Sequence, residues 1–280
     1  MHPVLFTIPR FSLFGIHFGE FEVRSYGVML MIGILFAMWW SARRARRWGI
    51  HPERVMDAAF WGIVPGIIGA RLGFIIQEWG YYSKHTNELW SLRFDGLTSF
   101  GGILMAVVGL WLYTKRAKIS TGAFFDVLSA PLLVAHAIGR VGCLLNGCCY
   151  GHATTAWFGV HVEGVEGLYA PAQLYDSFYV LAGLCVLWWF EHKPRPAGQS
   201  FALAVLLWGA ARFIYEFARA GSDLQVASGQ ATSTYWGTLP VTQAQVAALV
   251  LVVLGGLWLW VLGRRSRASL PEDAPEETPE

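Results

Sequence analysis

Seven long apolar runs dominate this sequence and limit the folds that it can adopt. A helix needs about 20 mostly apolar residues to cross the hydrocarbon core of a bilayer. Hydrophobic residues make up 55% of the 280 residues and charged residues only 14%, whereas a typical soluble domain has about 25% charged residues. We therefore expect an all-α polytopic membrane protein with seven transmembrane helices. The expected spans are Ser25–Trp40, Asp57–Gln77, Thr98–Tyr113, Gly122–Leu144, Gln173–Phe190, Ser200–Ala218 and Val241–Leu262.

Basic residues follow every second run and predict the orientation of the chain. They come after the first, third, fifth and seventh runs: Arg43, Arg44, Arg46, Arg47, Lys115, Arg116, Lys118, His192, Lys193, Arg195, Arg264, Arg265 and Arg267. Because cytoplasmic loops carry the excess of lysine and arginine, the N-terminus is expected outside and the C-terminus in the cytoplasm. The net charge of +2 gives no indication of nucleic-acid binding.

The remaining parts of the chain lie before and after this transmembrane domain, which we place at residues 25–265. Residues 1–24 are rich in phenylalanine and are expected to lie at the outer membrane interface. The segment Met1–Gly19 has no basic stretch followed by a continuous apolar core, so we expect no cleavable signal peptide. Residues 266–280 are acidic and rich in proline, which predicts a disordered cytoplasmic tail.

In this topology the polar residues of the spans fall mainly in their outer halves, while the inner halves are almost uniformly apolar. Arginines that merely extend to the interface would occupy both ends of the spans, so the clustering favours a binding site. The residues concerned are Tyr26, Arg71, His136, Arg140, Gln173, Tyr175, Asp176, Arg212, Glu216, Arg219 and Gln245.

Arg140 follows a mostly apolar run from Val127 to Val134. A single arginine there is ordinarily explained by its extension to the interface, but several arginines facing one cavity require an anion. Lipid phosphate is the abundant anion at that depth, and it fits the planar guanidinium group. Arg212 and Glu216 are one helical turn apart, and a structural ion pair explains these two residues equally well. It does not explain Arg140.

Four cysteines are present, and three of them follow Arg140 closely: Cys143, Cys148, Cys149 and Cys185. They are too few for a disulfide framework, and the spacing is not a standard zinc pattern, so we expect no metal and no cofactor. A disulfide fits an oxidising outer face, but the favoured interpretation is small thiols packed at a helix end. Cys185 is expected in the core.

A set of motifs resembles those of the bacterial prolipoprotein diacylglyceryl transferases, and together they extend from Pro3 to about Arg265. The motifs are Ser25-Tyr26-Gly27, Gly69-Ala-Arg71-Leu-Gly73, Gly101-Gly102, Asp126, Gly139-Arg140-Val-Gly142, Asn146-Gly147, Pro171-Ala-Gln173-Leu-Tyr175-Asp176, Arg212-Phe-Ile-Tyr-Glu216-Phe-Ala-Arg219 and Gln245. None is specific alone, but the series is specific.

The resemblance implies a reaction at the periplasmic leaflet of the bacterial inner membrane. The diacylglyceryl group of phosphatidylglycerol would pass to the lipobox cysteine of a prolipoprotein, forming a thioether and releasing glycerol 1-phosphate. Arg140 and Arg212 would hold the phosphate, and Tyr26 and Asn146 would bind the headgroup. The other residues that the resemblance places in the substrate cavity are Arg71, Gln173, Tyr175, Glu216, Arg219 and Gln245. Residues 152–170 and 222–238 are candidate docking segments or plain connectors.

The sequence also departs from the family's pattern. Phe100 stands where the family has a histidine that looks catalytic, and Cys143, Cys148 and Ala170 replace other characteristic residues. We hypothesise that His136 removes the thiol proton, because it shares a helix face with Arg140 and has a suitable ordinary pKa. A core histidine, or arginines that acidify the thiol without a base, are alternatives. A non-catalytic protein that binds or moves anionic phospholipid, or a transferase with another substrate, also remains open.

Overall fold

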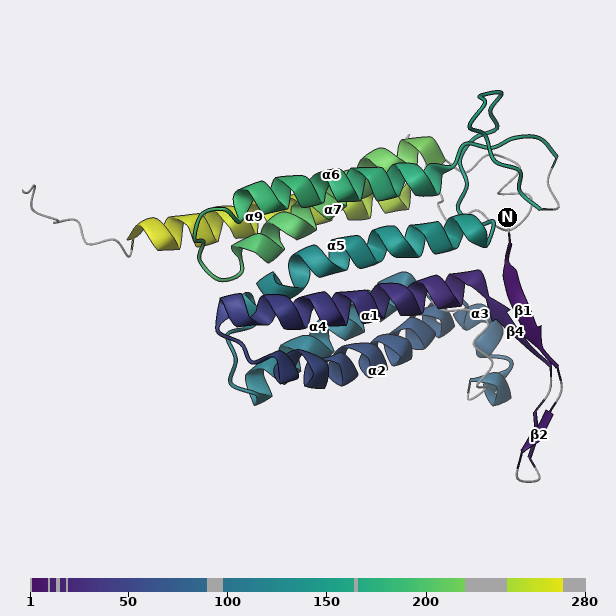
Figure 1. Ribbon diagram of the computed structural model, residues 1–280, viewed down its shortest axis with the longest axis horizontal. Coiled ribbons are helices and arrows are strands. Elements are labelled where there is room, and N and C mark those ends of the chain that lie inside the picture. Colours follow the sequence, from purple (N-terminus) through teal and green to yellow (C-terminus); the bar gives the residue numbers. More distant parts are fainter. Residues whose placement is uncertain are drawn as a thin grey trace, which may run out of the picture. The chain divides into compact units, whose positions relative to one another are not determined.

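The computed structural model describes residues 2–9, 11–13, 16–18, 20–89, 98–163, 166–219 and 241–268 (Figure 1). Each expected apolar run forms a long helix. The long helices are α1 (Ser25–Ala45), α2 (Pro52–Gln77), α4 (Ser99–Arg116), α5 (Thr121–Leu145), α6 (Ala172–Phe190), α7 (Gln199–Arg219) and α9 (Gln243–Ala268). Short helices are η1 (Arg46–Trp48), α3 (Trp79–Tyr82) and η2 (Thr86–Glu88).

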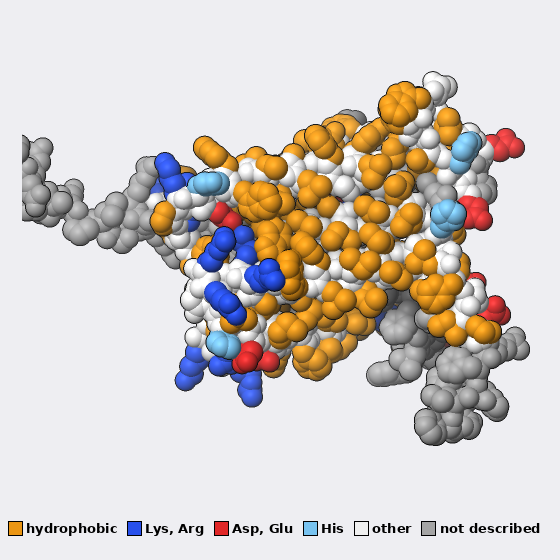
Figure 2. Space-filling view, viewed as in Figure 1, with side chains coloured by type: hydrophobic (Ala, Val, Ile, Leu, Met, Phe, Trp, Pro, Cys, Tyr) orange, Lys and Arg blue, Asp and Glu red, His pale blue; other side chains and the backbone are white. Residues whose placement is uncertain are grey.

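By length and composition, five of these helical segments are able to cross a membrane. They are Ser25–Trp48, Pro52–Gln77, Thr121–Leu145, Gln199–Arg219 and Gln243–Arg264. The polytopic, mostly helical character of the chain is thus confirmed, while the count of seven spans stays a prediction. In the described part of the chain the long helices expose large side chains such as Phe60, Leu104 and Trp189, and hydrophobic side chains cover most of the face seen in Figure 2.

The N-terminal residues require a correction to the all-α expectation, because they form four short strands. β1 (Val4–Ile8) pairs antiparallel with β4 (Phe21–Arg24), and β2 (Phe11–Leu13) pairs antiparallel with β3 (Ile16–Phe18). Aromatic and β-branched residues favour strands, and here they are paired across both ladders, as in Phe11 opposite Phe18. The predicted interfacial stretch is therefore a β-ribbon.

Hydrogen bonds hold the start of this ribbon against the ends of two helices. The His2 backbone amide donates to the Leu145 carbonyl at 3.0 Å, at the end of α5. The Ser25 hydroxyl, at the start of α1, donates to the carbonyls of His2 and Pro3. The first residues of the chain are thus connected to the outer end of the predicted fourth span.

The chain divides into two compact units. One comprises Met1–Ala37 with Leu128–Glu280, and the other comprises Met38–Val127. In the first unit, α6 packs on α5 and α7: the Ser177 hydroxyl donates to the Ala137 carbonyl at 3.3 Å, and Gly183 lies against Leu207. Gly255 of α9 closely approaches the backbone of α7. These contacts position the polar residues described below.

In the second unit, glycines bring α2 and α4 into backbone contact. A Cβ atom on Gly101 would lie 2.2 Å from the Gly69 carbonyl oxygen, and one on Gly109 would lie 1.9 Å from the Trp61 carbonyl oxygen. Small residues of this kind allow helices to pack closely in membranes. The glycines and Pro65 that made the second span uncertain in the sequence therefore belong to one continuous helix of 26 residues.

We expect Gly109→Ala to destabilise the protein by at least about 1–3 kcal/mol, because the methyl group overpacks a rigid backbone contact. Thermal unfolding of the purified protein in detergent measures this effect. Gly256→Ala is the matched control, since a Cβ atom there meets only Leu206 Cδ1 at 3.8 Å. Equal unfolding temperatures for the two variants would contradict the close packing of α2 and α4.

Candidate functional site

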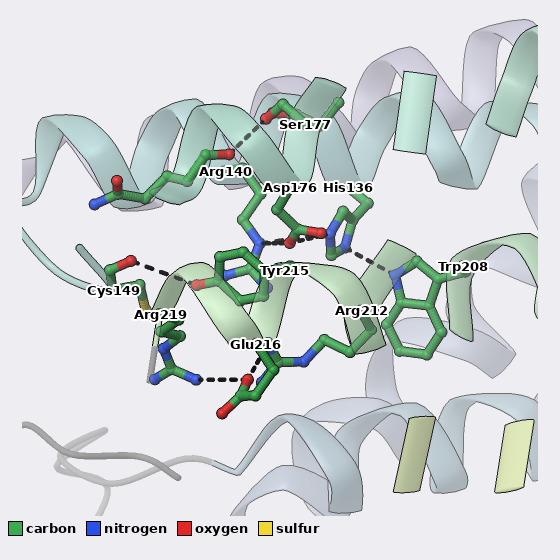
Figure 3. Close-up of polar contacts among 12 residues, drawn as sticks. His136, Arg140, Cys149, Asp176, Ser177, Trp208, Arg212, Tyr215, Glu216 and Arg219 are labelled. Atoms are coloured by element: carbon green, nitrogen blue, oxygen red, sulfur yellow. Dashed lines mark hydrogen bonds and ion pairs between the residues drawn. The ribbon is translucent and has the colours of Figure 1, made fainter. Parts of the chain in front are cut away.

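A buried carboxylate connects α5 and α6 in the first unit. Asp176 of α6 is 1% exposed, and its Oδ2 atom lies 3.0 Å from His136 Nε2 and 2.5 Å from Arg140 Nε, both on α5 (Figure 3). A buried charge is costly unless it is paired and hydrogen-bonded. Asp176 therefore fixes the two α5 side chains that the sequence places on one helix face.

A second group of charges lies on α7. Arg212 Nη1 is 2.8 Å from Glu216 Oε2, and Arg219 Nη1 is 3.9 Å from the same oxygen. The Glu216 side chain is fully buried. These pairs have the spacing at which side chains meet on one helix face, so the expected ion pair between Arg212 and Glu216 is present. Arg140 takes its partner from a different helix.

The buried ring of Tyr215 brings the two groups together. The guanidinium carbons of Arg140 and Arg212 lie 5.0 and 4.8 Å from the ring centroid, and that of Arg219 lies at 6.0 Å. Cations are attracted to aromatic faces at these distances. The Tyr215 hydroxyl also donates to the Cys149 carbonyl at 3.4 Å. Arg140 and Arg212, from different helices, are consequently no more than about 10 Å apart.

Both ring nitrogens of His136 have partners. Trp208 Nε1 donates to Nδ1 at 3.4 Å, and the two rings meet edge to face at a centroid distance of 5.8 Å. Nε2 lies 3.0 Å from Asp176 Oδ2, and the Arg140 Nε–H donates to the same Nε2 atom at 3.4 Å. The ring of His136 therefore lies between Asp176, Arg140 and Trp208, with a hydrogen-bonding group at each ring nitrogen.

Several buried polar atoms of this cluster lack a hydrogen bond to any residue that the structure describes. They are Gln173 Oε1, Asp176 Oδ1, Arg212 Nη1, Glu216 Oε1 and Glu216 Oε2. Arg212 Nη1 and Glu216 Oε2 are close enough for an ion pair but are not aligned as a hydrogen bond. A buried polar atom without a partner costs about 1–3 kcal/mol, so this cluster is suited to a polar ligand or to water.

Other residues expected at the site take different positions. Tyr26 of α1 lies against Gly142 and interacts electrostatically with Arg140. The Asn146 side chain forms a hydrogen bond with the Cys148 side chain. Gln173 Nε2 donates to the Cys148 carbonyl at 2.6 Å. Tyr175 is half-buried on α6.

The contacts of Gln245 and Arg71 are with residues outside this cluster. Gln245 caps α9, because its Oε1 accepts from the Thr242 amide at 2.9 Å and its own amide donates to the Thr242 hydroxyl at 3.1 Å. Arg71 belongs to the second unit, where it donates to the Glu88 carbonyl at 3.4 Å and lies over the Tyr82 ring. Phe100 is also in that unit and is 63% exposed.

The sequence analysis placed Asp176 in the polar cluster without giving it a role, and it did not single out Tyr215 or Trp208. Tyr215 carried a signal, since it is three residues after Arg212 and four before Arg219 and therefore shares their helix face. Asp176 was also recognisable from the sequence, because a carboxylate inside an apolar run needs a cationic partner. Trp208 is one of 14 tryptophans, and nothing in the sequence distinguished it.

The sulfur atoms of Cys143, Cys148 and Cys149 lie within 4.8 Å of one another at the end of α5. Hydrogen bonds from the Cys143 and Cys148 thiols lower the pKa of Cys149 well below its ordinary value of 9.0, although burial opposes this shift; Arg219 and Arg140 add to it. Cys185 is exposed on α6, so its expected core position is wrong.

Of the two candidate docking segments, residues 152–170 are described except for residues 164 and 165. Val160 and Tyr169 exchange backbone hydrogen bonds of 2.9 and 3.0 Å, and Tyr169 packs with Tyr150 and Val162. Trp157 is 93% exposed. Residues 222–238 and the acidic tail from residue 269 onward lie outside the described residues.

Fold and site together define a polytopic helical membrane protein with arginines and carboxylates clustered between three helices. The chain belongs to the prolipoprotein diacylglyceryl transferase family, whose model matches residues 13–262. It is similar to the phosphatidylglycerol–prolipoprotein diacylglyceryl transferase of Dehalococcoides mccartyi, at 34% identity over 84% of this chain and 88% of the relative. The corresponding proteins of Methylobacillus flagellatus and Bacillus mycoides are 31% and 27% identical, over 92% and 95% of this chain and 98% and 97% of the relatives. The resemblance found in the sequence is thus confirmed.

Proposed function

We propose that this protein transfers the diacylglyceryl group of phosphatidylglycerol to the lipobox cysteine of prolipoproteins. The thiol sulfur forms a thioether with the glyceryl carbon, and glycerol 1-phosphate leaves. Membership of the family and the names of the relatives support this reaction. The substrates are an anionic membrane lipid and the signal peptide of a secreted protein.

The observation that carries this proposal is the placement of Arg140 and Arg212 on one aromatic ring. Their guanidinium carbons are 5.0 and 4.8 Å from the Tyr215 centroid, and their side chains are 16% and 18% exposed. Two partly accessible guanidinium groups at this separation suit the oxygens of one phosphate. The negative charge that grows on the departing phosphate is then stabilised by cations already in place, which is how such sites accelerate a reaction.

The remaining residues assist at the headgroup. Tyr26 and Asn146 bind the glycerol, Gln173 and Tyr175 line the cavity, and Glu216 holds Arg212 and Arg219 in position. Arg71 and Gln245 complete the set that the family's motifs assign to substrate binding, although their contacts in the structure are with Glu88 and Thr242.

The proposed topology places this site toward the periplasmic leaflet of the bacterial inner membrane. The seven apolar runs give seven spans, and the basic residues at the C-terminal ends of α1, α4, α6 and α9 give an outer N-terminus and a cytoplasmic C-terminus. In this arrangement the β-ribbon lies on the periplasmic side, where the unfolded part of a secreted substrate arrives.

His136 is the proposed acceptor of the thiol proton. We expect His136→Ala to lower kcat/KM by about 10²–10⁴-fold, the range for loss of a general base. His192→Ala is the control, because its ring is exposed beyond the end of α6. If His136→Ala turned over at the wild-type rate, His136 would have no part in the mechanism. The remaining explanation would be that the arginines lower the pKa of the substrate thiol, so that no base is needed.

A transfer assay tests the function itself. The purified full-length protein is mixed with labelled phosphatidylglycerol and a lipobox peptide, and the thioether product is identified by mass spectrometry. Depletion of the ordinary transferase in a host that expresses this chain asks the same question in cells. Tight binding of phosphatidylglycerol without product or complementation would instead favour the lipid-binding alternative, to which the loss of a proton acceptor at Phe100 points.

A further inference from the structure

The three cysteines at the end of α5 have no role in the transfer reaction as proposed so far. Cys143 lies in the last turn of α5, and the Cys148 amide donates to its carbonyl at 3.1 Å, which folds the following turn back onto the helix. Gly147 and Cys149 have φ values of 72° and 65°. A non-glycine residue in this region costs energy and is found where a function requires it, and here the strained turn gathers the three thiols.

We propose that Cys143, Cys148 and Cys149 bind one zinc ion through their sulfur atoms and leave its fourth coordination position to the substrate thiol. The proposal rests on the transferase function proposed above. Zinc sites with three protein ligands and one open position are characteristic of catalysis rather than of structure. A disulfide accounts for only two of the three thiols.

The geometry of the cluster fits such an ion. Zinc–sulfur bonds of about 2.3 Å place the sulfur atoms of a tetrahedral site about 3.8 Å apart, and the three Sγ atoms already lie within 4.8 Å of one another. Cys143 is buried while Cys148 and Cys149 are partly accessible, so a fourth ligand can approach from their side. Thiolates prefer zinc or monovalent copper, and zinc suits a reaction without a redox step.

The charges around the cluster also favour a bound trithiolate. Three thiolates around a divalent cation carry one net negative charge, and Arg219 and Arg140 are the cations that interact with Cys149. Arg140 is also one of the two arginines proposed to hold the phosphate. A thiol on the open position is therefore next to the group from which the glyceryl carbon must be displaced.

Coordination gives the substrate thiol the reactivity that Phe100 cannot supply. A thiol that binds zinc is deprotonated, and its proton passes to His136. The sulfur electron pair then forms the carbon–sulfur bond with the glyceryl carbon that bears the phosphate ester. The carbon–oxygen bond breaks, and its electrons leave with glycerol 1-phosphate between Arg140 and Arg212. The neutral thioether is a poorer ligand than the thiolate, so the product dissociates.

Cobalt titration of the purified full-length protein tests the site, because Co²⁺ reports thiolate ligands by charge-transfer absorption. We expect one Co²⁺ per chain, displaced by Zn²⁺. Each of Cys143→Ser, Cys148→Ser and Cys149→Ser should weaken binding by at least about 100-fold. Cys185→Ser is the matched control and should bind as the wild type does, because this cysteine is on the exposed face of α6.

The proposal is overturned if the wild-type protein gives no thiolate-to-cobalt absorption, or if the control loses as much binding as the other variants. It is also overturned if non-reducing mass spectrometry finds two of the three cysteines joined in a disulfide without metal. Removal of the metal should abolish transfer, and Zn²⁺ should restore it. Full transfer by the metal-free protein would overturn only the catalytic role of the zinc ion. Normal metal binding without any transfer would refute the proposed transferase function, but the metal site itself would stand.

Discussion

Replacing Arg140 with glutamine is expected to lower the rate of diacylglyceryl transfer by about 10²–10³-fold, the range for loss of one group that stabilises transition-state charge. The same change leaves Asp176 buried at 1% exposure without its closest cation, and breaking such a pair costs about 3–5 kcal/mol. Loss of activity and loss of stability therefore coincide in this variant, and a second substitution has to separate them.

The double variant Arg140→Gln, Asp176→Asn makes that separation. It removes the unpaired charge, so the unfolding temperature in detergent should return toward the wild-type value. Transfer should remain lost, because the phosphate still lacks a guanidinium group. Arg24→Gln is the control for charge alone, since the side chains of Arg24 and Glu22 are 68% and 51% exposed and such pairs contribute about 0–1 kcal/mol. Recovery of transfer in the double variant would show that Arg140 has only a structural role.

The helices were predictable because length and apolar composition alone determine where a chain can cross a bilayer. The spacing of His136 and Arg140, and of Arg212 and Glu216, was also readable, because residues four apart share a helix face. The partner of Arg140 could not be predicted, because Asp176 lies on another helix. Neither segment alone indicates how α5 packs against α6.

Local backbone geometry accounts for what the sequence did not reveal. The Cys-x4-Cys-Cys spacing matches no standard zinc pattern, and its thiols converge only because the turn at Gly147 and Cys149 has positive φ values. Gln245, expected in the substrate cavity, caps α9 together with Thr242. The four N-terminal strands are each three to five residues long, too short for a clear alternating pattern.

Glu216→Gln is expected to produce an enzyme that binds phosphatidylglycerol more tightly but turns it over more slowly. Glu216 is fully buried and contacts Arg212 at 2.8 Å and Arg219 at 3.9 Å, so the substitution removes the carboxylate charge of the Arg212 ion pair. The free protein should lose about 3–5 kcal/mol of stability. The lipid phosphate then no longer competes with the Glu216 carboxylate for Arg212, so KM should fall. Because the arginines are no longer held for the transition state, kcat should fall as well.

Thermal unfolding with and without lipid measures this exchange of anions. A ligand that binds only the folded state raises the unfolding temperature according to its affinity. Phosphatidylglycerol should therefore stabilise Glu216→Gln more than it stabilises the wild type, and zwitterionic phosphatidylethanolamine should not. Glu53→Gln, at a side chain that is 86% exposed, should behave as the wild type does. Equal stabilisation of all three proteins by phosphatidylglycerol would mean that Glu216 and the lipid phosphate do not compete for the same arginines, and the phosphate would then have to bind elsewhere.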